Sequence, residues 1–438
     1  MDNQRNTNRN RTTASNSVNR RRMSEAQKAK KKKEARLIRI LTYLVITILI
    51  AVIVLIVVSC NRKKNNNDIV DPSNPETIVE TETKPTRSEV ELVAVGDVLM
   101  HTPLLNYADN GDGTYDFNSI FDVMRDDISR ADIAVCNQET PVDPTCDPDG
   151  GIHFIFNTPP EIVDAEINAG FDIATQCSNH TYDMGWDGIL HTVDYWKSKS
   201  DKIKMIGANA SQEERDTIFT YNKNGITFAM LNYTYGLNGF ELPEDMPYLV
   251  TIIDDYNYDL IKSDISRAKE LADFVIVFPH WGSEDVVGNT TDFQDYWAKV
   301  FTEAGADLII GTHPHVCERI DWVTADNGNK ALCYYSIGNY ASNQQETPEV
   351  LGGMAKVKIV KENGKTYIDE SATGVVPVVT HNENLGGFTD RVVCYKLSDY
   401  TEDLAYEHDI YVNGRDNFSL ERLHELADEI FGKWIISY

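Results

Sequence analysis

The chain has 438 residues and a formal net charge of −27 at pH 7, and this charge is unevenly distributed. Residues 1–39 contain 13 Lys and Arg against 3 Asp and Glu, whereas the remainder contains 28 against 65. So acidic a body excludes nucleic acid as a partner, and the length allows one large domain with appendages or two domains.

Three segments precede the folded body. Residues 1–36 are rich in Asn, Arg, Lys, Ser and Thr, which predicts a disordered basic tail. Residues 37–59 include an uncharged run from 40 to 58. At about 1.5 Å per residue, that run spans roughly the 30 Å of a hydrocarbon core, so we expect a transmembrane signal anchor. Residues 60–89 are Asn-rich and then acidic, which predicts an extended linker.

Basic residues just before the apolar run set the expected orientation in the membrane. Positions 20–22, 30–33, 36 and 39 are all Arg or Lys, so the positive-inside rule places the N-terminus in the cytoplasm. We expect a single-pass protein of the cell membrane with its linker and body outside. A bacterial lipoprotein stays open as an alternative, because Val57 to Cys60 resembles a lipobox, although the basic region is long for a signal peptide.

From residue 90 onward the pattern is typical of an α/β sheet, with strand-like runs that follow helix-like segments. We expect helices at 160–169, 186–197, 260–272 and 293–304, with Gly170 and Gly305 as C-terminal caps. After residue 340 strands alternate, with a hairpin turn at 362–365 and an amphipathic helix at 420–435. The prediction is a core at 90–345, completed by C-terminal strands and a terminal helix at 346–438.

Six cysteines lie in this body, and none has the spacing of a metal knuckle. An oxidising compartment would allow disulfides between Cys136 and Cys146 or between Cys317 and Cys333. Buried free thiols are equally compatible with the sequence.

Five strand-like runs end in side chains that bind metals, and the carboxyl ends of such strands meet in one crevice. The run ends are Gly96-Asp97, Asn137 to Glu139, Asn179-His180, His280 and His313-Pro314-His315. Taken singly, each has a structural explanation, such as a turn, a helix cap or a core histidine. Together they predict a metal centre, because oxygen ligands mixed with neutral imidazoles suit Zn, Mn or Fe better than Ca. His313 and His315, two residues apart in extended backbone, would point the same way and suit two neighbouring ions.

The ordered set Asp, Glu, Asn-His, His and His-x-His resembles the metallophosphoesterase, or calcineurin-like, superfamily. More specifically, GDVLMH, NQET, CSNHTYDMGWDG, PHWGSE, GTHPHV and YSIGNY look like the poly-γ-glutamate capsule-synthesis (CapA) family over about residues 90–345. The resemblance implies a four-layer α/β/β/α sandwich with two divalent ions, Mn, Fe or Zn. It implies that His180 faces substrate as the catalytic residue, and that the metal ligands are Asp97, Glu139, Asn179, His280, His313 and His315.

Two departures from the superfamily pattern concern the first two motifs. Phosphoesterases usually have Asp-x-His in the first, whereas the nearest histidine after Asp97 is His101. Glu139 stands where phosphoesterases have Asp. These departures leave open whether one metal site is weakened or lost.

The resemblance implies a membrane-anchored, extracytoplasmic protein that makes, attaches or trims an anionic envelope polymer. One hypothesis is a dimetal hydrolase or transferase in which His180 protonates the leaving group and Asp183, Trp186 or Asp187 orients His180 or shapes a pocket. The other is a non-catalytic accessory subunit that guides polymer out of a membrane synthase. The implied partners are the lipid bilayer, the polymer and synthase subunits.

Overall fold

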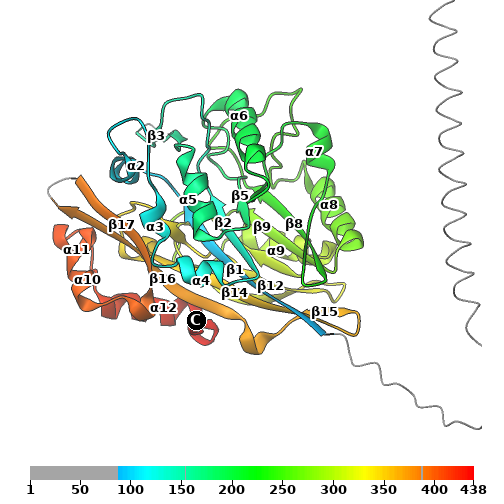
Figure 1. The fold of residues 1–438 in the computed structure, drawn as a ribbon. Helices are drawn as coiled ribbons and strands as arrows, with labels where there is room; N and C mark the ends of the chain where they lie inside the picture. The colour runs from blue at the N-terminus through cyan, green and yellow to red at the C-terminus, as the bar shows by residue number, and fades with distance from the viewer. Residues whose placement is uncertain (1–86, 153, 386–387) are drawn as a thin grey trace, which may run out of the picture. The chain divides into compact units, whose positions relative to one another are not determined.

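The computed structural model describes residues 87–152, 154–385 and 388–438 (Figure 1). The predicted tail, the predicted anchor and residues 60–86 of the predicted linker lie outside these residues. Within the described part, no helix combines the length and apolar character needed to cross a bilayer. The first strand, β1 (Arg87–Val98), begins inside the segment predicted as a linker, because Arg87 to Glu89 already pair with β14.

Two sheets form the centre of the described domain. The first has nine strands in the order β17-β16-β14-β1-β2-β5-β6, with β13 paired to β1 and β15 paired to β14. Its other strands are β2 (Ile133–Gln138), β5 (Ile173–Thr175), β6 (Lys204–Ile206), β13 (Asn339–Ala341), β14 (Leu351–Glu362), β15 (Lys365–Ile368), β16 (Gly374–Leu385) and β17 (Phe388–Lys396). Strands β1, β2, β5, β6 and β13 run parallel, whereas β14 to β17 are antiparallel.

The second sheet has six strands in the order β11-β12-β10-β9-β8-β7. They are β7 (Phe219–Lys223), β8 (Ile226–Thr234), β9 (Phe274–His280), β10 (Leu308–Ile310), β11 (Ile320–Thr324) and β12 (Lys330–Tyr334). The four inner strands are parallel and the two outer strands antiparallel. A short ribbon of β3 (Asp149–Gly150) and β4 (Phe156–Asn157) lies in the connection after β2.

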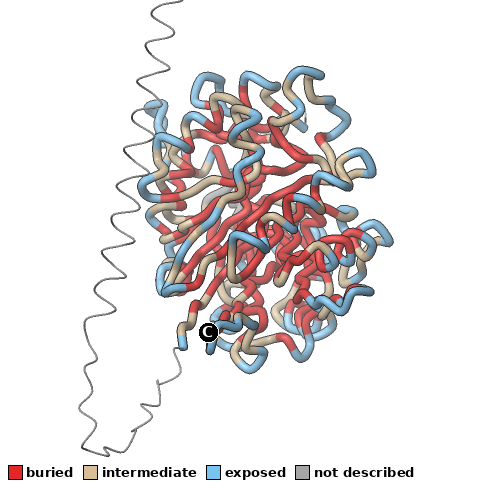
Figure 2. Tube along the Cα trace, turned by 90° about the vertical axis from the view of Figure 1, so that its right-hand side faces the viewer, coloured by how far each residue is buried: buried red, intermediate tan, exposed pale blue. Residues whose placement is uncertain are grey.

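Successive strand residues point to opposite faces of a sheet, so each sheet has an inner and an outer face. The two inner faces pack against each other in one hydrophobic core. Leu92 of β1 and Phe228 of β8 both lie in this inner core, and Figure 2 shows the buried residues concentrated along the central strands. Helices α2 (Thr102–Ala108), α3 (Asn118–Phe121), α4 (Arg125–Ser129) and α5 (Glu161–Ala169) cover the outer face of the first sheet. Helices α8 (Tyr258–Leu271) and α9 (Asp292–Ala304) cover the outer face of the second. The predicted α/β class is confirmed.

The remaining helices fill the flanks. Helices α6 (Gly185–Ser198) and α7 (Gln212–Asp216) line one pocket together with β6 and the start of β7. Helices α10 (Glu402–Glu407), α11 (Asp409–Asn413) and α12 (Leu420–Phe431) lie beside β16 and β14 and contribute to the inner core (Figure 1). Single 3-10 turns occur at Thr347–Val350, Glu370–Ala372, Leu397–Asp399 and Gly432–Trp434.

Local sequence signals located several of these elements. Gly170 ends α5 at a φ of 99°, and Gly305 ends α9 at a φ of 123°, both conformations that glycine adopts without steric cost. Asn363 and Gly364, with φ of 53° and 79°, form the predicted hairpin between β14 and β15. The predicted terminal helix is shorter than expected, because Gly432 at a φ of 47° turns the chain and Ile435 instead bridges to Val375.

All six cysteines of the described body are free, and Cys146 alone among them is exposed. Neither of the disulfides that the sequence allows is present. The buried thiols instead pack as small apolar side chains within the hydrophobic cores of the domain.

Candidate metal centre

The candidate ligands converge because the parallel strands present their carboxyl ends at one edge of the two sheets. Asp97, near the end of β1, is in register with Asn137 of β2 and Asn339 of β13. His280 is the last residue of β9 and bridges to Thr312, which precedes the two remaining histidines. All seven residues expected at the site are buried, namely Asp97, Glu139, Asn179, His180, His280, His313 and His315.

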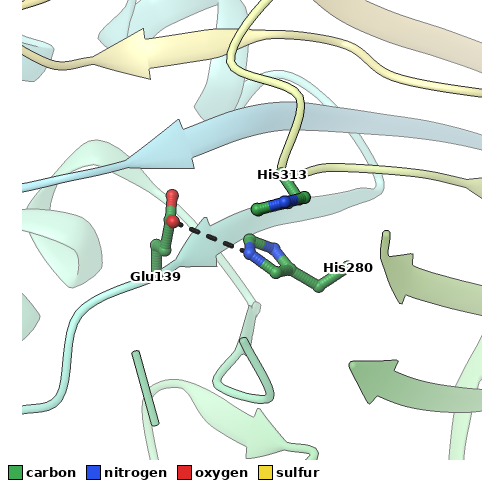
Figure 3. A group of neighbouring side chains, drawn as sticks. All are labelled: Glu139, His280 and His313. Atoms are coloured by element: carbon green, nitrogen blue, oxygen red, sulfur yellow. Dashed lines mark ion pairs between the residues drawn. The ribbon is translucent and has the colours of Figure 1, made fainter. Parts of the chain in front are cut away.

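Glu139 lies at the middle of the cluster. Its carboxylate is fully buried, and neither oxygen has a hydrogen-bond partner among the described residues. The Nε2 atom of His280 lies 3.6 Å from its Oε1 (Figure 3), and that of His315 lies 3.8 Å from the same oxygen. Burial raises the pKa of Glu139 well above its usual range, while His315 lowers it and Asp97 raises it further. A buried charge without partners is strongly destabilising, so a cation at this place would offset the penalty.

Two groups of donor atoms share Glu139. One consists of Glu139, His280 and His313, and the other of Asp97, Glu139 and His315; within each, the donor atoms lie within 4.8 Å of one another. The Oδ1 atom of Asn179 lies 2.8 Å from Nε2 of His280, which adds an amide oxygen beside the first group. The arrangement suits two neighbouring ions that share one carboxylate.

The protonation of the three histidines supports this interpretation. Burial lowers the pKa of His280 and of His313 well below the usual value, so both imidazoles are neutral, the form that binds metals. Nδ1 of His313 is buried and has no hydrogen-bond partner within the described chain. Burial opposes protonation of His315 as well, but the carboxylates of Glu139 and Asp97 raise its pKa to about 10. A proton on His315 balances the negative charge of the neighbouring acids Glu139 and Asp97. A metal ion bound at this place would replace that proton.

The expectation that His313 and His315 lie in extended backbone is wrong. Their φ angles are 98° and 58°, in the left-handed region that residues other than glycine rarely adopt. The ring centroids nevertheless lie 5.8 Å apart, because the turn around Pro314 directs both rings into the cluster. Such backbone strain persists only where surrounding contacts fix it, and it is concentrated at functional sites.

Position 99, where the Asp-x-His pattern would place its histidine, is Leu99, which is buried in the core. His101 does not take that place. Its Nδ1 accepts a hydrogen bond from the backbone N–H of Asn343 at 3.2 Å, and His101 belongs to none of the metal-binding groups found in the described chain. Asp97 itself is held by Asn137, whose Nδ2 donates to Oδ1 at 2.7 Å. The Oδ2 atom accepts the backbone N–H of His313 at 3.3 Å and lies 3.2 Å from Nδ1 of His315.

The candidate catalytic residue, His180, lies at the rim of the cluster. Its Nδ1 is 2.8 Å from Oδ2 of Asp183, and this oxygen also accepts the backbone N–H of Phe156 at 2.8 Å. The Phe156 ring packs edge-on against the imidazole with the centroids 4.7 Å apart. Asp183 therefore orients His180, whereas Trp186 and Asp187 belong to the first turn of α6.

Three residues of the site were not among those predicted from the sequence. Asn238 accepts a hydrogen bond from Nδ2 of Asn179 at 3.0 Å, and its own Nδ2 lies 3.4 Å from Nδ1 of His180. The Tyr235 ring lies 4.4 Å, centroid to centroid, from that of His313. Glu284 forms a third group with His313 and His315. The available signals were the loop YGLNGF directly after a strand and the acid at the end of PHWGSE.

Buried carboxylates, neutral imidazoles and an amide oxygen form a donor set that fits a transition metal. The fold and the cluster thus define the class: an α/β domain with a candidate metal centre at its strand ends. A family model described as "Bacterial capsule synthesis protein PGA_cap" matches residues 91–344, which is more than half of the chain. The chain belongs to this family of bacterial capsule synthesis proteins.

Two curated relatives are similar in sequence. The "PGA biosynthesis protein CapA" of Bacillus subtilis (strain 168) is 29% identical over 255 residues, covering 57% of this chain and 62% of the relative. The "Capsule biosynthesis protein CapA" of Bacillus anthracis is 28% identical over 214 residues, covering 48% and 49%. The chain thus spans between about half and three fifths of the length of these relatives.

Solved structures also align with the chain. The calcineurin-like phosphoesterase YfkN from Bacillus subtilis aligns with a TM-score of 0.39 and 12% identity, over 78% of this chain and 99% of its own. A putative 5'-nucleotidase from Staphylococcus aureus aligns with a TM-score of 0.41 and 15% identity, over 66% and 54%.

Proposed function

We propose that this capsule synthesis protein is a dimetal hydrolase or transferase that acts on an amide or phosphoester bond of an anionic envelope polymer. The observation that carries the proposal is the buried Glu139, a carboxylate that has no hydrogen-bond donor among the described residues and belongs to two groups of candidate metal ligands. The relatives' names, which refer to PGA and to capsule biosynthesis, support a polymer of the poly-γ-glutamate type as the substrate.

In this proposal some side chains would bind metal and His180 would transfer a proton. Asp97, Glu139 and His315 would hold one ion, and Glu139, Asn179, His280 and His313 the other. When bound, Mn, Fe or Zn ions would lower the pKa of a water molecule and polarise the scissile group. Asp183 accepts the Nδ1 proton of His180, so the protonated ring would present its Nε2–H to the leaving group and become neutral on giving it up.

The placement at the membrane is part of the proposal. Residues 37–59 would anchor the chain, with the basic tail in the cytoplasm, the body outside and the bilayer and a membrane synthase as partners. An anchored lipoprotein beginning at Cys60 is the alternative form of attachment. Either form would hold the metal centre near the site where an exported polymer leaves the membrane.

A second candidate function is that of a non-catalytic accessory subunit in a synthase or export complex. The observation that favours it is Leu99, because the position of a metal-binding histidine in the first motif holds a side chain that cannot bind metal. In that case the remaining ligands would have a structural role.

Metal analysis of the full-length protein, solubilised in detergent, tests the metal centre. We expect the wild type to bind up to two transition-metal ions, and His313→Ala to lose at least one, because His313 belongs to two of the three metal-binding groups. A parallel assay with phosphoester and γ-glutamyl substrates identifies the bond. Equal metal content in the wild type and in His313→Ala would refute the ligand assignment.

A further inference from the structure

The loop between β9 and α9, residues 281–291, lies beside the turn that carries His313 and His315. The backbone N–H of Asp285 donates to the carbonyl of Pro314 at 3.0 Å, and that of Gly288 donates to the carbonyl of Cys317 at 3.0 Å. Gly282 makes the bend possible, since its φ is 107° and a Cβ there would lie 2.7 Å from the Gln294 side chain. Backbone contacts therefore hold the loop over the metal-binding turn.

Glu284 occupies the part of this loop next to the two histidines. One of its carboxylate oxygens and one nitrogen from each of His313 and His315 lie within 4.8 Å of one another. The two imidazoles are buried whereas Glu284 is exposed, so the carboxylate reaches the cluster from the solvent side. The buried Nδ1 of His313, unpartnered within the described chain, is an independent sign that the cluster is incomplete on protein atoms alone.

The two expected ions differ in the number of protein donors available to them. Glu139, His280 and His313, together with the oxygen of Asn179, offer four donors to one ion. Asp97, Glu139 and His315 offer three to the other, because Leu99 replaces the histidine expected in the first motif. Structural sites commonly use four protein ligands, whereas catalytic sites use three and keep one position open, so the second ion has room for one more donor.

We propose that Glu284 is a further metal ligand, which joins the centre beside His313 and His315 from the solvent side. This inference rests on the metal centre of the proposed function. Glu284, from the loop after β9, would supply a carboxylate in place of the histidine that is missing at position 99. Because Glu284 is the exposed member of the set, it is also the ligand that a substrate oxygen entering from solvent can displace.

Asp285 provides a matched control for this role. It is also an exposed acid and the next residue in the same loop, but it belongs to none of the metal-binding groups in the described chain. Glu284→Gln and Asp285→Asn each remove one negative charge at nearly the same place. Asparagine also tolerates the φ of 64° at position 285, so this control keeps the backbone of the loop.

The experiment titrates the metal-free, full-length protein in detergent with Mn²⁺ or Zn²⁺ and measures ions bound per chain and each dissociation constant by competition with a chelator. We expect Glu284→Gln to weaken one of two ions by about tenfold or more, a loss of the size that altered ligand shells produce. Asp285→Asn should stay within about twofold of the wild type, as its side chain does not reach the cluster.

Binding of both ions by Glu284→Gln with wild-type affinity would overturn the assignment of Glu284. An equal loss in Asp285→Asn would also overturn it, because the effect would then come from the charge of the loop. His313→Ala distinguishes these failures from failure of the centre itself, which would show as unchanged metal binding in His313→Ala as well. Thermal unfolding of the metal-free variants checks that each retains the wild-type fold.

Discussion

At the residue scale, Glu139 and His180 differ in whether their buried polar atoms have hydrogen-bond partners among the described residues. Glu139 is buried without a hydrogen-bond donor from the described residues, so its environment is unfavourable unless a cation or a proton neutralises it. His180, by contrast, has its hydrogen-bond partner in Asp183 and packs against Phe156. In the proposed function Glu139 would bind metal and His180 would not, so variants of the two residues separate metal binding from catalysis experimentally.

His180→Ala is expected to keep the metal content and thermal stability of the wild type and to lower activity about 10²- to 10⁴-fold, the usual contribution of a general acid. The reason is that His180 would act on the leaving group, and that it lies at the rim of the cluster and holds no metal in the proposed assignment. Metal content, melting temperature and polymer production in cells are the three measurements. Asn179 adjoins His180, so metal content must be measured in the same preparation.

Asp183→Asn is the companion variant, because it removes the carboxylate that orients His180 while leaving the imidazole in place. A partial loss of activity with an altered pH profile fits a positioning role. Full complementation of a deletion strain by His180→Ala, with normal metal content, would instead favour the accessory subunit.

At the scale of elements, α5 carries an unusual buried acid. Glu166 is fully buried, and neither carboxylate oxygen has a hydrogen-bond partner within the described chain. Burial raises its pKa from 4.5 to about 8, although the nearby Cys136 thiol lowers it. The folded state therefore holds a proton here that the unfolded state releases above pH 4.5.

Folding stability should fall as pH rises through this window, since the folded state binds more protons than the unfolded state between pH 4.5 and about 8. The slope from this one group approaches about 1.4 kcal/mol per pH unit. Glu166→Gln should remove that contribution and raise stability at neutral pH. Urea unfolding at several pH values measures it, and an unchanged pH dependence in Glu166→Gln would assign the slope to other groups. Glu161→Gln, at the partly exposed start of the same helix, is the matched control.

The elements differ in how far the sequence could predict them. Amphipathic periodicity and the glycine caps located α5, α6, α8 and α9, and the strand ends located the ligands, because both signals are local. The short helices α2, α3 and α4, and the strands β11 and β12, carry no comparable local signal. Their places depend on packing against sheets assembled from distant segments.

The site shows the same limit. Asn238 and Glu284 reach the cluster only because their loops follow β8 and β9, whose neighbours are set by the sheet order. The left-handed turn at His313 and His315 was predicted as extended backbone, since no glycine marks it. What the sequence could not predict was thus tertiary in origin: the contacts between loops and the strain that those contacts maintain.

At the scale of the whole molecule, the first sheet joins the two ends of the described chain. β1 pairs with β14 along eight residue pairs from Arg87↔Glu362 to Ala94↔Ala355, and α12 contributes to the core between the sheets. The family match ends at residue 344, before β14 begins. The residues after the match are therefore needed to cover β1, the strand that carries Asp97.

Charge is the other property of the whole molecule, and it bears on how the chain is placed in the cell. Residues 1–39 carry about ten net positive charges, whereas the remainder is strongly acidic. Moving such a basic tail across a bilayer is disfavoured, so we expect the tail inside and the body outside. Protease added to intact cells should remove an epitope tag at the C-terminus and leave one at the N-terminus intact. Permeabilised cells, in which both tags become accessible, are the control. A protected C-terminal tag would reverse the orientation, and a mature chain that begins at a lipid-modified Cys60 in mass spectrometry would establish the lipoprotein form instead.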